Sequence, residues 1–108
     1  MPEEDIQLKE SLRPLANFAR RAGIIVNGRE KLRRSQKQLH CILVTCDISE
    51  NSLREITQGC RCPIYQALQS ADIEELFGLS NAKIIGFKQN PLAAGMAKLL
   101  NGRQIQNQ

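Results

Sequence analysis

Apolar residues recur at helical spacing in the first part of the chain and in short continuous runs farther along it. The helical spacing predicts a first helix from about Ser11 to Ala22, ended by Gly23. Pro14 is acceptable there because it falls within the predicted first turn. The repeating apolar positions are Leu12, Leu15, Phe18 or Ala19, and Ala22. The polar residues 1–10 are expected to be flexible, as are residues 103–108.

The short apolar runs alternate with amphipathic stretches, which is typical of an α/β fold. The runs predict strands at residues 24–26, 41–45, 63–68 and 83–87. Further helices are predicted at about residues 28–37, 49–59, 70–77 and 90–100. This order indicates a mixed or mostly parallel sheet between two helical layers.

Polar residues before the predicted helices supply candidate caps. Asn27 is predicted to cap the second helix, and Glu30 stands where the reciprocal partner of a capping box would be. Asp47 and Ser49 are predicted caps for the third helix. All aromatic residues fall at predicted core positions, namely Phe18, Tyr65, Phe77 and Phe87. A surface that stacks bases on aromatic rings is therefore disfavoured.

Positive charge is concentrated between Arg20 and Lys37, where seven basic residues accompany one acidic residue, Glu30. This segment carries a net charge of +6, so the rest of the chain sums to −2 and the total is +4. Two interpretations remain open. The charged residues either form an ordinary solvated face, or they bind the phosphates of a nucleic acid.

The predicted second helix, residues 28–37, would carry most of that charge. Leu32 is its only clearly apolar residue, so its buried stripe is narrow. Four basic residues lie on or beside one face by helical spacing, namely Arg29, Arg33, Arg34 and Lys37. In the binding interpretation, backbone amides at the start of this helix contact phosphate oxygens. Arg20 and Arg21 would extend the basic strip.

Length and composition limit the classes of protein. A chain of 108 residues fits one domain, and 42% hydrophobic with 24% charged residues is typical of a soluble globular protein. No apolar run is long enough to span a bilayer, and the acidic start of the chain is unlike a signal peptide. We therefore expect a cytoplasmic monomer with no membrane association.

Few residues are suited to catalysis. The single histidine, His40, lies in a predicted strand, and no glycine-rich phosphate loop ending in Gly-Lys-Ser or Gly-Lys-Thr is present. The carboxylates occur mostly along predicted helices, as at Glu74 and Glu75. We expect no catalytic residues, no cofactor and no metal ion, and hence a protein that is not an enzyme.

The four cysteines allow two interpretations. Cys41 and Cys46 lie in an apolar run that predicts a buried strand, where reduced thiols are common. Cys60 and Cys62 are separated by one residue, whereas zinc ligands commonly have two to four residues between them. Inert thiols in the core or at strand ends are the first interpretation. A metal or redox site at Cys60 and Cys62 is the second.

Five short segments, taken in order, resemble the ribosomal protein L-seven-Ae / L-thirty-e superfamily. They are Leu15–Gly23, Gly28–Lys31, the strand that ends in Asp47, Cys62–Tyr65 and Ile73–Gly78. The resemblance covers roughly residues 12–100 and is nearest to the small bacterial RNA-binding members. It implies a three-layer α-β-α sandwich with a four-stranded mixed sheet. It also implies binding of a kink-turn or related internal-loop RNA, with the ribosome as a candidate partner.

In this superfamily one set of RNA contacts comes from the start of the second helix, commonly Gly-x-Asn-Glu-x-x-Lys. Aligning its glycine with Gly28 places Glu30 at the asparagine. The same alignment places Lys31 at the glutamate and Arg34 at the lysine. Aligning the asparagine with Asn27 instead makes Lys31 the lysine. In either register the asparagine and glutamate that read base edges are not both retained.

The second set of family contacts falls in the loop at residues 78–82, where Leu79 would cap a flipped-out base. The resemblance and the charge together predict a non-catalytic RNA site at Asn27, Gly28, Arg29, Glu30, Lys31, Arg33, Arg34, Lys37, Leu79, Ser80 and Asn81. The substituted base-reading positions leave an alternative. The chain would then be a protein-interaction or assembly module that keeps the fold and has weak or non-specific RNA affinity.

Overall fold

The computed structural model describes residues 3–105, which form one mixed sheet flanked by helices. The strands are β1 (Ile25–Asn27), β2 (Leu39–Val44), β3 (Ile64–Gln66), β4 (Ile84–Lys88) and β5 (Gln104–Ile105). The helices are α1 (Glu3–Ala22), α2 (Arg29–Arg34), the 3-10 turn η1 (Gln36–Gln38), α3 (Glu50–Gly59), α4 (Ser70–Phe77) and α5 (Pro91–Leu99). The strand order in the sheet is β1-β4-β2-β3-β5. Only β2 and β3 run parallel, and the other neighbours are antiparallel.

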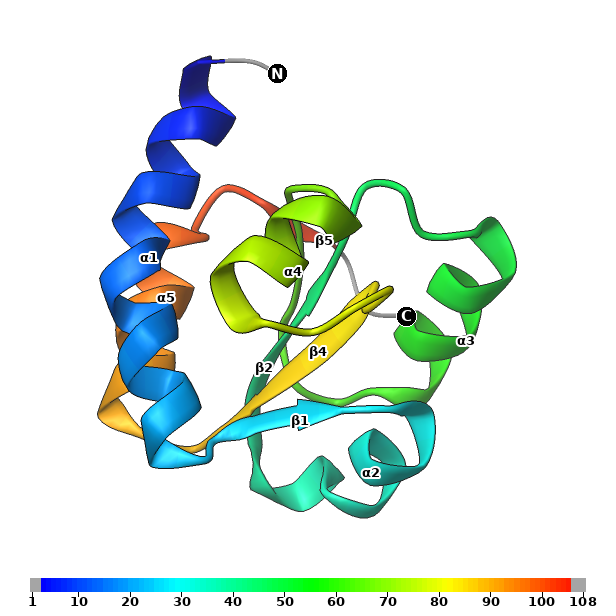
Figure 1. The fold of residues 1–108 in the computed structure, drawn as a ribbon. Coiled ribbons are helices and arrows are strands. Elements are labelled where there is room, and N and C mark those ends of the chain that lie inside the picture. Colours follow the sequence, from blue (N-terminus) through cyan, green and yellow to red (C-terminus); the bar gives the residue numbers. More distant parts are fainter. Residues whose placement is uncertain (1–2, 106–108) are drawn as a thin grey trace.

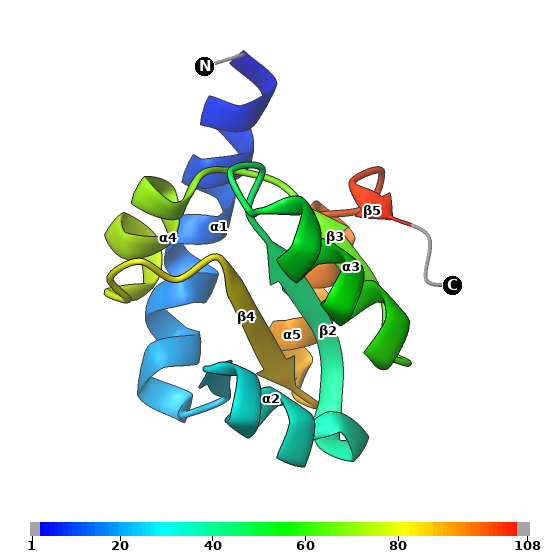
Figure 2. The same ribbon diagram turned by 90° about the vertical axis from the view of Figure 1, so that its right-hand side faces the viewer.

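Helices cover both faces of the sheet (Figure 1). The three-helix layer consists of α1, α4 and α5, and the two-helix layer on the opposite face consists of α2 and α3. In Figure 2 the two-helix layer stands in front of β2 and β4, with α1 and α5 behind them. The predicted three-layer α-β-α sandwich is confirmed. The predicted four strands are too few, because residues 104–105 pair antiparallel with β3 and add a fifth strand.

The remaining predicted elements are present with shifted ends. α2 ends at Arg34 rather than Lys37, because the Gln38 amide donates to the Ser35 carbonyl and tightens the chain into η1. α3 ends at the predicted Gly59 and is capped by Ser49, whose hydroxyl accepts a 3.2 Å hydrogen bond from the Ser52 amide. The helical spacing was therefore a better guide to helix position than to helix length.

α1 begins at Glu3, well before the predicted start at Ser11. Leu8 continues the buried stripe of the helix toward its N-terminus, and acidic residues in the first turn complement the helix dipole. Pro14 therefore lies inside the helix rather than in its first turn. Residues 3–10, predicted to be flexible, are helical, while residues 1–2 and 106–108 lie outside the described part. No helix within residues 3–105 has both the length and the apolar character to cross a membrane.

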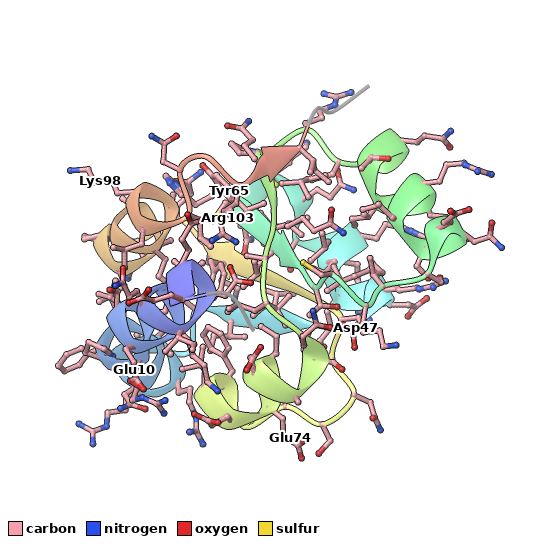
Figure 3. All side chains as sticks on the ribbon, turned by 90° about the horizontal axis from the view of Figure 1, so that it is seen from above. Glu10, Asp47, Tyr65, Glu74, Lys98 and Arg103 are labelled. Carbon is pink, nitrogen blue, oxygen red and sulfur yellow. The ribbon has the colours of Figure 1, made fainter. Side chains whose placement is uncertain are left out.

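Ion pairs fix α1 to elements far away in the sequence. Lys9 Nζ lies 3.0 Å from an Asp72 oxygen and 2.9 Å from a Glu75 oxygen, both in α4. Hydrogen bonds to these carboxylates raise the pKa of Lys9, and the bond to Glu75 has the larger effect. Asp5 and Arg103 form a 2.7 Å ion pair that joins the start of α1 to the residue before β5. Figure 3 shows Arg103 directed toward α1.

The larger hydrophobic core lies between the sheet and the three-helix layer. Phe87 of β4 is fully buried there, and its ring packs against Phe77 of α4 with 5.6 Å between the ring centroids. Ala16 and Ala19 supply the inward stripe of α1. Phe18 was predicted to be in the core, and this is wrong because its side chain is 54% exposed. Ala19 takes the inward position that the spacing could not distinguish from Phe18.

A smaller core lies between the sheet and the two-helix layer. Leu32 is the single buried residue of α2, and it packs with alternate residues of β2 such as Ile42 and Val44. Gly86 of β4 allows the Leu32 side chain to approach the sheet closely, because it has no side chain of its own. A β-carbon at Gly86 would lie 2.7 Å from Leu32 Cδ2 and 2.9 Å from Leu39 Cδ2. The absence of a side chain at Gly86 thus allows α2 to sit directly on the sheet.

Candidate functional site

The antiparallel pairing of β1 and β4 brings two distant segments together. Asn27, the last residue of β1, pairs with Ile85, near the start of β4. The chain that leaves β1 toward α2 therefore lies beside the chain that enters β4 from α4. These are the two segments in which the sequence predicts contacts with RNA, and the sheet register places them at one edge of the molecule.

A groove runs along this edge and has a volume of about 400 Å³. The start of α3 closes its third side. Its lining is mixed, with polar side chains such as Asn27, Ser52 and Asn81 beside buried or half-buried apolar ones such as Leu32 and Ile84. It is lined by Asn27, Gly28, Arg29, Leu32, Ile48, Ser49, Ser52, Asn81, Ala82, Lys83 and Ile84. A groove that combines apolar side chains with amide, hydroxyl and cationic groups is suited to a ligand that has both apolar and polar surface.

The turn into α2 does not have the predicted cap. Gly28 occupies the N-cap position, and no side chain accepts a hydrogen bond there, so the predicted capping box of Asn27 and Glu30 is wrong. Gly28 has a φ of +103°, a backbone conformation that disfavours other residues, although a β-carbon there would meet nothing within 4 Å. The glycine is required by the backbone turn, and this turn leaves the Asn27 side chain exposed on the groove rim.

Two of the predicted basic residues already have acidic neighbours. Arg29 contacts Glu55 at 3.1 Å and donates a 2.7 Å hydrogen bond to the Ser52 hydroxyl. Arg34 lies 3.5 Å from Glu30, one helical turn before it. The Arg29 and Glu55 side chains are 64% and 66% exposed, so solvent weakens their attraction. This ion pair therefore contributes little to the stability of the fold.

The remaining basic side chains surround α2 on different sides. Lys31 and Arg34 line a second hollow at the outer edge of β1, together with Lys88. Arg33 lines a hollow between α2 and α3. Lys37 belongs to η1 and is exposed outside these hollows. Of the predicted cationic set, Arg29 lines both the groove and the hollow of Arg33, while Lys31 and Arg34 lie apart from them beside β1.

The loop after α4 is ordered by contacts at both ends. Gly78 ends α4 in the left-handed conformation with φ of +71°, and the Arg20 guanidinium lies so close that a β-carbon at Gly78 would come within 3.0 Å of it. The Ser80 hydroxyl donates to Glu74 at 3.2 Å. Leu79 is half-buried because it packs against the larger core, so it is less available to a base than predicted. Asn81 lines the groove.

Asp47 holds the start of α4 rather than the start of α3, where its cap was predicted. Its carboxylate accepts hydrogen bonds from the Ser70 hydroxyl at 2.6 Å and from the Ser70 amide at 3.1 Å. The bond from the Ser70 hydroxyl is the main cause that lowers the pKa of Asp47 to about 2. Lys83 Nζ also donates to the Asp47 backbone carbonyl at 3.3 Å. Figure 3 shows Asp47 beside α4, with Glu74 on the outer side of that helix.

Several residues of this edge were not predicted. Ser49 and Ser52 reach the groove from α3, and Lys83 reaches it from the start of β4. Lys88 joins Lys31 and Arg34 in the second hollow. Lys83 and Lys88 are isolated lysines at the two ends of a predicted strand. No local sequence pattern distinguishes them from ordinary solvated lysines. Within residues 3–105, no group of three or more His, Cys, Asp or Glu side chains is placed to hold a metal ion.

Comparisons with known proteins identify similar folds. Neither the known protein-family models nor the curated protein sequences include a match to this chain. The structure is similar to a Bacillus halodurans protein of unknown function, with a TM-score of 0.74, 17% identity, and coverage of 81% of this chain and 93% of that one. It is also similar to the 15.5kD RNA binding protein of Giardia lamblia, with a TM-score of 0.67, 9% identity, and coverage of 95% and 97%. At these identities the likeness is one of fold.

Proposed function

We propose that this protein binds structured RNA, of the kink-turn or a related internal-loop class, through the groove between β1, α3 and the loop after α4. The observation that carries the proposal is the groove itself. It joins Asn27, Gly28 and Arg29 with Asn81 in one hollow, although residues 30–80 separate the two segments in the sequence. The structurally similar protein of Giardia lamblia is an RNA binding protein, which supports the same function.

The groove residues divide into two chemical roles. The Asn27 and Asn81 amides each offer a donor and an acceptor, which suits the edges of unpaired or sheared bases. Arg29 and Lys83 supply positive charge to the rim and would contact phosphates that flank those bases. Because α2 has only six residues, the side chains rather than the end of this helix are expected to make the main contacts.

Cations outside the groove would hold the flanking backbone. Lys31, Arg34 and Lys88 lie on the outer side of α2 and β1, where a sharply bent RNA would return toward the protein. The position of these cations on a surface apart from the groove favours a bent RNA over a straight one.

The test is a titration of a fluorescently labelled kink-turn RNA beside a straight duplex of equal length and charge. We expect tighter binding of the kink-turn RNA, with an affinity that falls steeply as salt rises. Asn81→Ala and Lys83→Ala should each weaken binding of the kink-turn RNA. Lys98→Ala, which removes an exposed lysine from α5 in the three-helix layer, is the matched control and should leave the affinity unchanged.

A protein-interaction or assembly module is the second candidate. The ion pairs Arg29–Glu55 and Arg34–Glu30 favour it, because they neutralise part of the basic surface within the chain. This candidate predicts equal, weak and salt-sensitive binding of both RNAs. It also predicts the same small effect from Lys83→Ala and Lys98→Ala, so the titration separates the two functions.

A further inference from the structure

Cys60 and Cys62 bring two sulfur atoms together in the turn between α3 and β3. Cys60 follows the last residue of α3, and Cys62 is two residues before β3. Their Sγ atoms lie 3.0 Å apart, and the Cys60 sulfur is also 3.7 Å from the Cys62 carbonyl oxygen. A single residue, Arg61, separates them. This turn lies outside the groove and has no part in the proposed RNA binding.

We propose that Cys60 and Cys62 form a reversible dithiol–disulfide site that exchanges with small disulfides. The geometry carries the proposal, because the two sulfurs are already in contact and need only a small further approach to bond. Neither remaining cysteine has this arrangement. Cys41 is fully buried in β2, and Cys46 is exposed after that strand, against the prediction that it is buried.

The contact between the sulfurs also makes the pair acidic. The two sulfurs share one hydrogen bond, which lowers the pKa of Cys60 to about 7 and raises the pKa of Cys62. The contact therefore favours loss of one proton from the pair and disfavours loss of the second. By contrast, burial raises the pKa of Cys41 to about 12, which keeps that thiol protonated and inert.

Exchange follows from this arrangement in two steps. Cys60 is 7% exposed and Cys62 is half-buried, so a small disulfide reaches the pair at Cys62. The shared proton moves to Cys60, and the Cys62 thiolate attacks one sulfur of the disulfide and releases one thiolate. Cys60 then gives up its proton and attacks the Cys62 sulfur, which releases a second thiolate. The protein loses two hydrogen atoms, and the small disulfide becomes two thiols.

Two further features favour reversible oxidation over a metal site or a permanent crosslink. A closed zinc site needs four ligands, and within residues 3–105 no group of three or more His, Cys, Asp or Glu side chains is placed to hold a metal ion. A disulfide across one residue removes little entropy from the unfolded chain, so it stabilises the fold little. Such a bond is suited to opening and closing with the thiol–disulfide balance of its surroundings.

The test uses the full reduced chain, incubated with a mixture of reduced and oxidised glutathione. Remaining thiols are alkylated and the protein is digested with trypsin. Trypsin cleaves after Arg61 and so divides the two cysteines between peptides 55–61 and 62–83, while Cys41 and Cys46 share peptide 38–54. We expect peptides 55–61 and 62–83 to be recovered as a disulfide-linked pair that separates on reduction. Glutathione adducts without this link, links to peptide 38–54, or unmodified peptides would each overturn the proposal.

Matched variants complete the test. Cys46→Ser should leave the linked pair unchanged, because that exposed cysteine is not part of the site. Cys60→Ser and Cys62→Ser should each abolish the link, and Cys60→Ser should accumulate a glutathione adduct at Cys62. The map of the wild-type chain decides the proposal even if a serine at the nearly buried position 60 disturbs folding. If the Cys62→Ser variant gave the same peptide map as the wild-type chain, the proposal would be contradicted.

Discussion

The two helical layers of this protein differ in how they are attached to the sheet. The three-helix layer packs on a large core that includes Phe87 and Met96, and ion pairs from Lys9 and Arg13 tie α1 to α4. The two-helix layer packs on a smaller core, to which α2 contributes only Leu32. The groove and its basic surroundings all lie at the edge of the two-helix layer. The larger core thus lies on one side of the sheet, and the candidate groove lies at the edge of the other side.

This difference explains how a short polar helix can persist. α2 has six residues, fewer than an isolated helix needs in water. Its position depends on Leu32 and on the close approach that Gly86 permits. The rest of its surface is consequently free to carry charge. Substitutions should therefore separate into those that unfold the protein and those that only impair binding.

Phe87→Ala should have the largest effect on stability. The substitution leaves a cavity at the centre of the larger core, where Phe77 loses its aromatic partner. We expect the free energy of unfolding to fall by about 3–5 kcal/mol, measured by urea denaturation. Leu99→Ala, at a 39% exposed position in α5, is the control and should change it by less than about 1 kcal/mol. Similar losses for the two variants would mean that the larger core is not the main source of stability.

Gly86→Ala should have an intermediate effect on stability and a disproportionate effect on RNA binding. The new methyl group displaces Leu32 and with it α2, which we expect to cost about 1–2 kcal/mol of unfolding free energy. Gly95→Ala is the matched control, because its methyl group would meet Leu15 at an ordinary 3.6 Å and a helical glycine is replaced. It should stabilise the protein by roughly 0.5–1 kcal/mol. Unchanged RNA affinity in Gly86→Ala would separate the position of α2 from binding.

Asp47→Asn should have a smaller, pH-dependent effect. Hydrogen bonds from Ser70 lower the pKa of Asp47 from its ordinary 3.8 to about 2, so the charged carboxylate stabilises the folded protein. This contribution is fully present above pH 3.8 and is lost as the pH falls through about 2. Because Asp47 is exposed, we expect a difference from the wild type of only about 1 kcal/mol at pH 7. Urea denaturation at several pH values should show that difference vanish in acid; a constant difference would contradict the assignment.

Lys31→Ala and Arg34→Ala should have the smallest effect on stability. Both side chains are exposed in the second hollow, so the urea midpoint should stay near that of the wild type. RNA affinity should fall roughly threefold to tenfold for each, and the slope of log affinity against log salt should decrease by about one per lost phosphate contact. Lys98→Ala again serves as the control. Parallel losses of stability and binding would mean that these residues are structural.

The sequence predicts the fold well where a local pattern is complete. Branched apolar runs mark β2 and β4, and the glycines at positions 59 and 78 mark where α3 and α4 end. The start of α1 was missed because its N-terminal turns are mostly polar and their partners in α4 are distant in sequence. β5 was missed because two residues carry no periodicity, and only pairing with β3 defines them.

The candidate site was predicted in part. The resemblance and the charge pattern together predicted Asn27–Arg29 and Asn81, which the pairing of β1 with β4 brings into one groove. The charge pattern grouped Arg33 and Lys37 with them on a single long helix, but the chain tightens into η1 after Arg34 and divides that face. Lys83 could not be found without the sheet register. Helical spacing describes one helix at a time. The candidate groove is lined by three separate segments, namely the turn from β1 into α2, the start of α3 and the chain between α4 and β4.

The ion pair between Asp5 and Arg103 links the beginning of the described chain to its end. Its 2.7 Å separation brings the first turn of α1 beside the residue that leads into β5. A linker between the two ends of the described chain would start from elements that this ion pair already holds in place, and a circular permutant could open in an exposed loop elsewhere. The order in which the helices and strands are synthesised would then change while both faces of the sheet remained covered. Such a permutant would retain the groove, since β1 and β4 pair through the sheet and not through the ends of the chain.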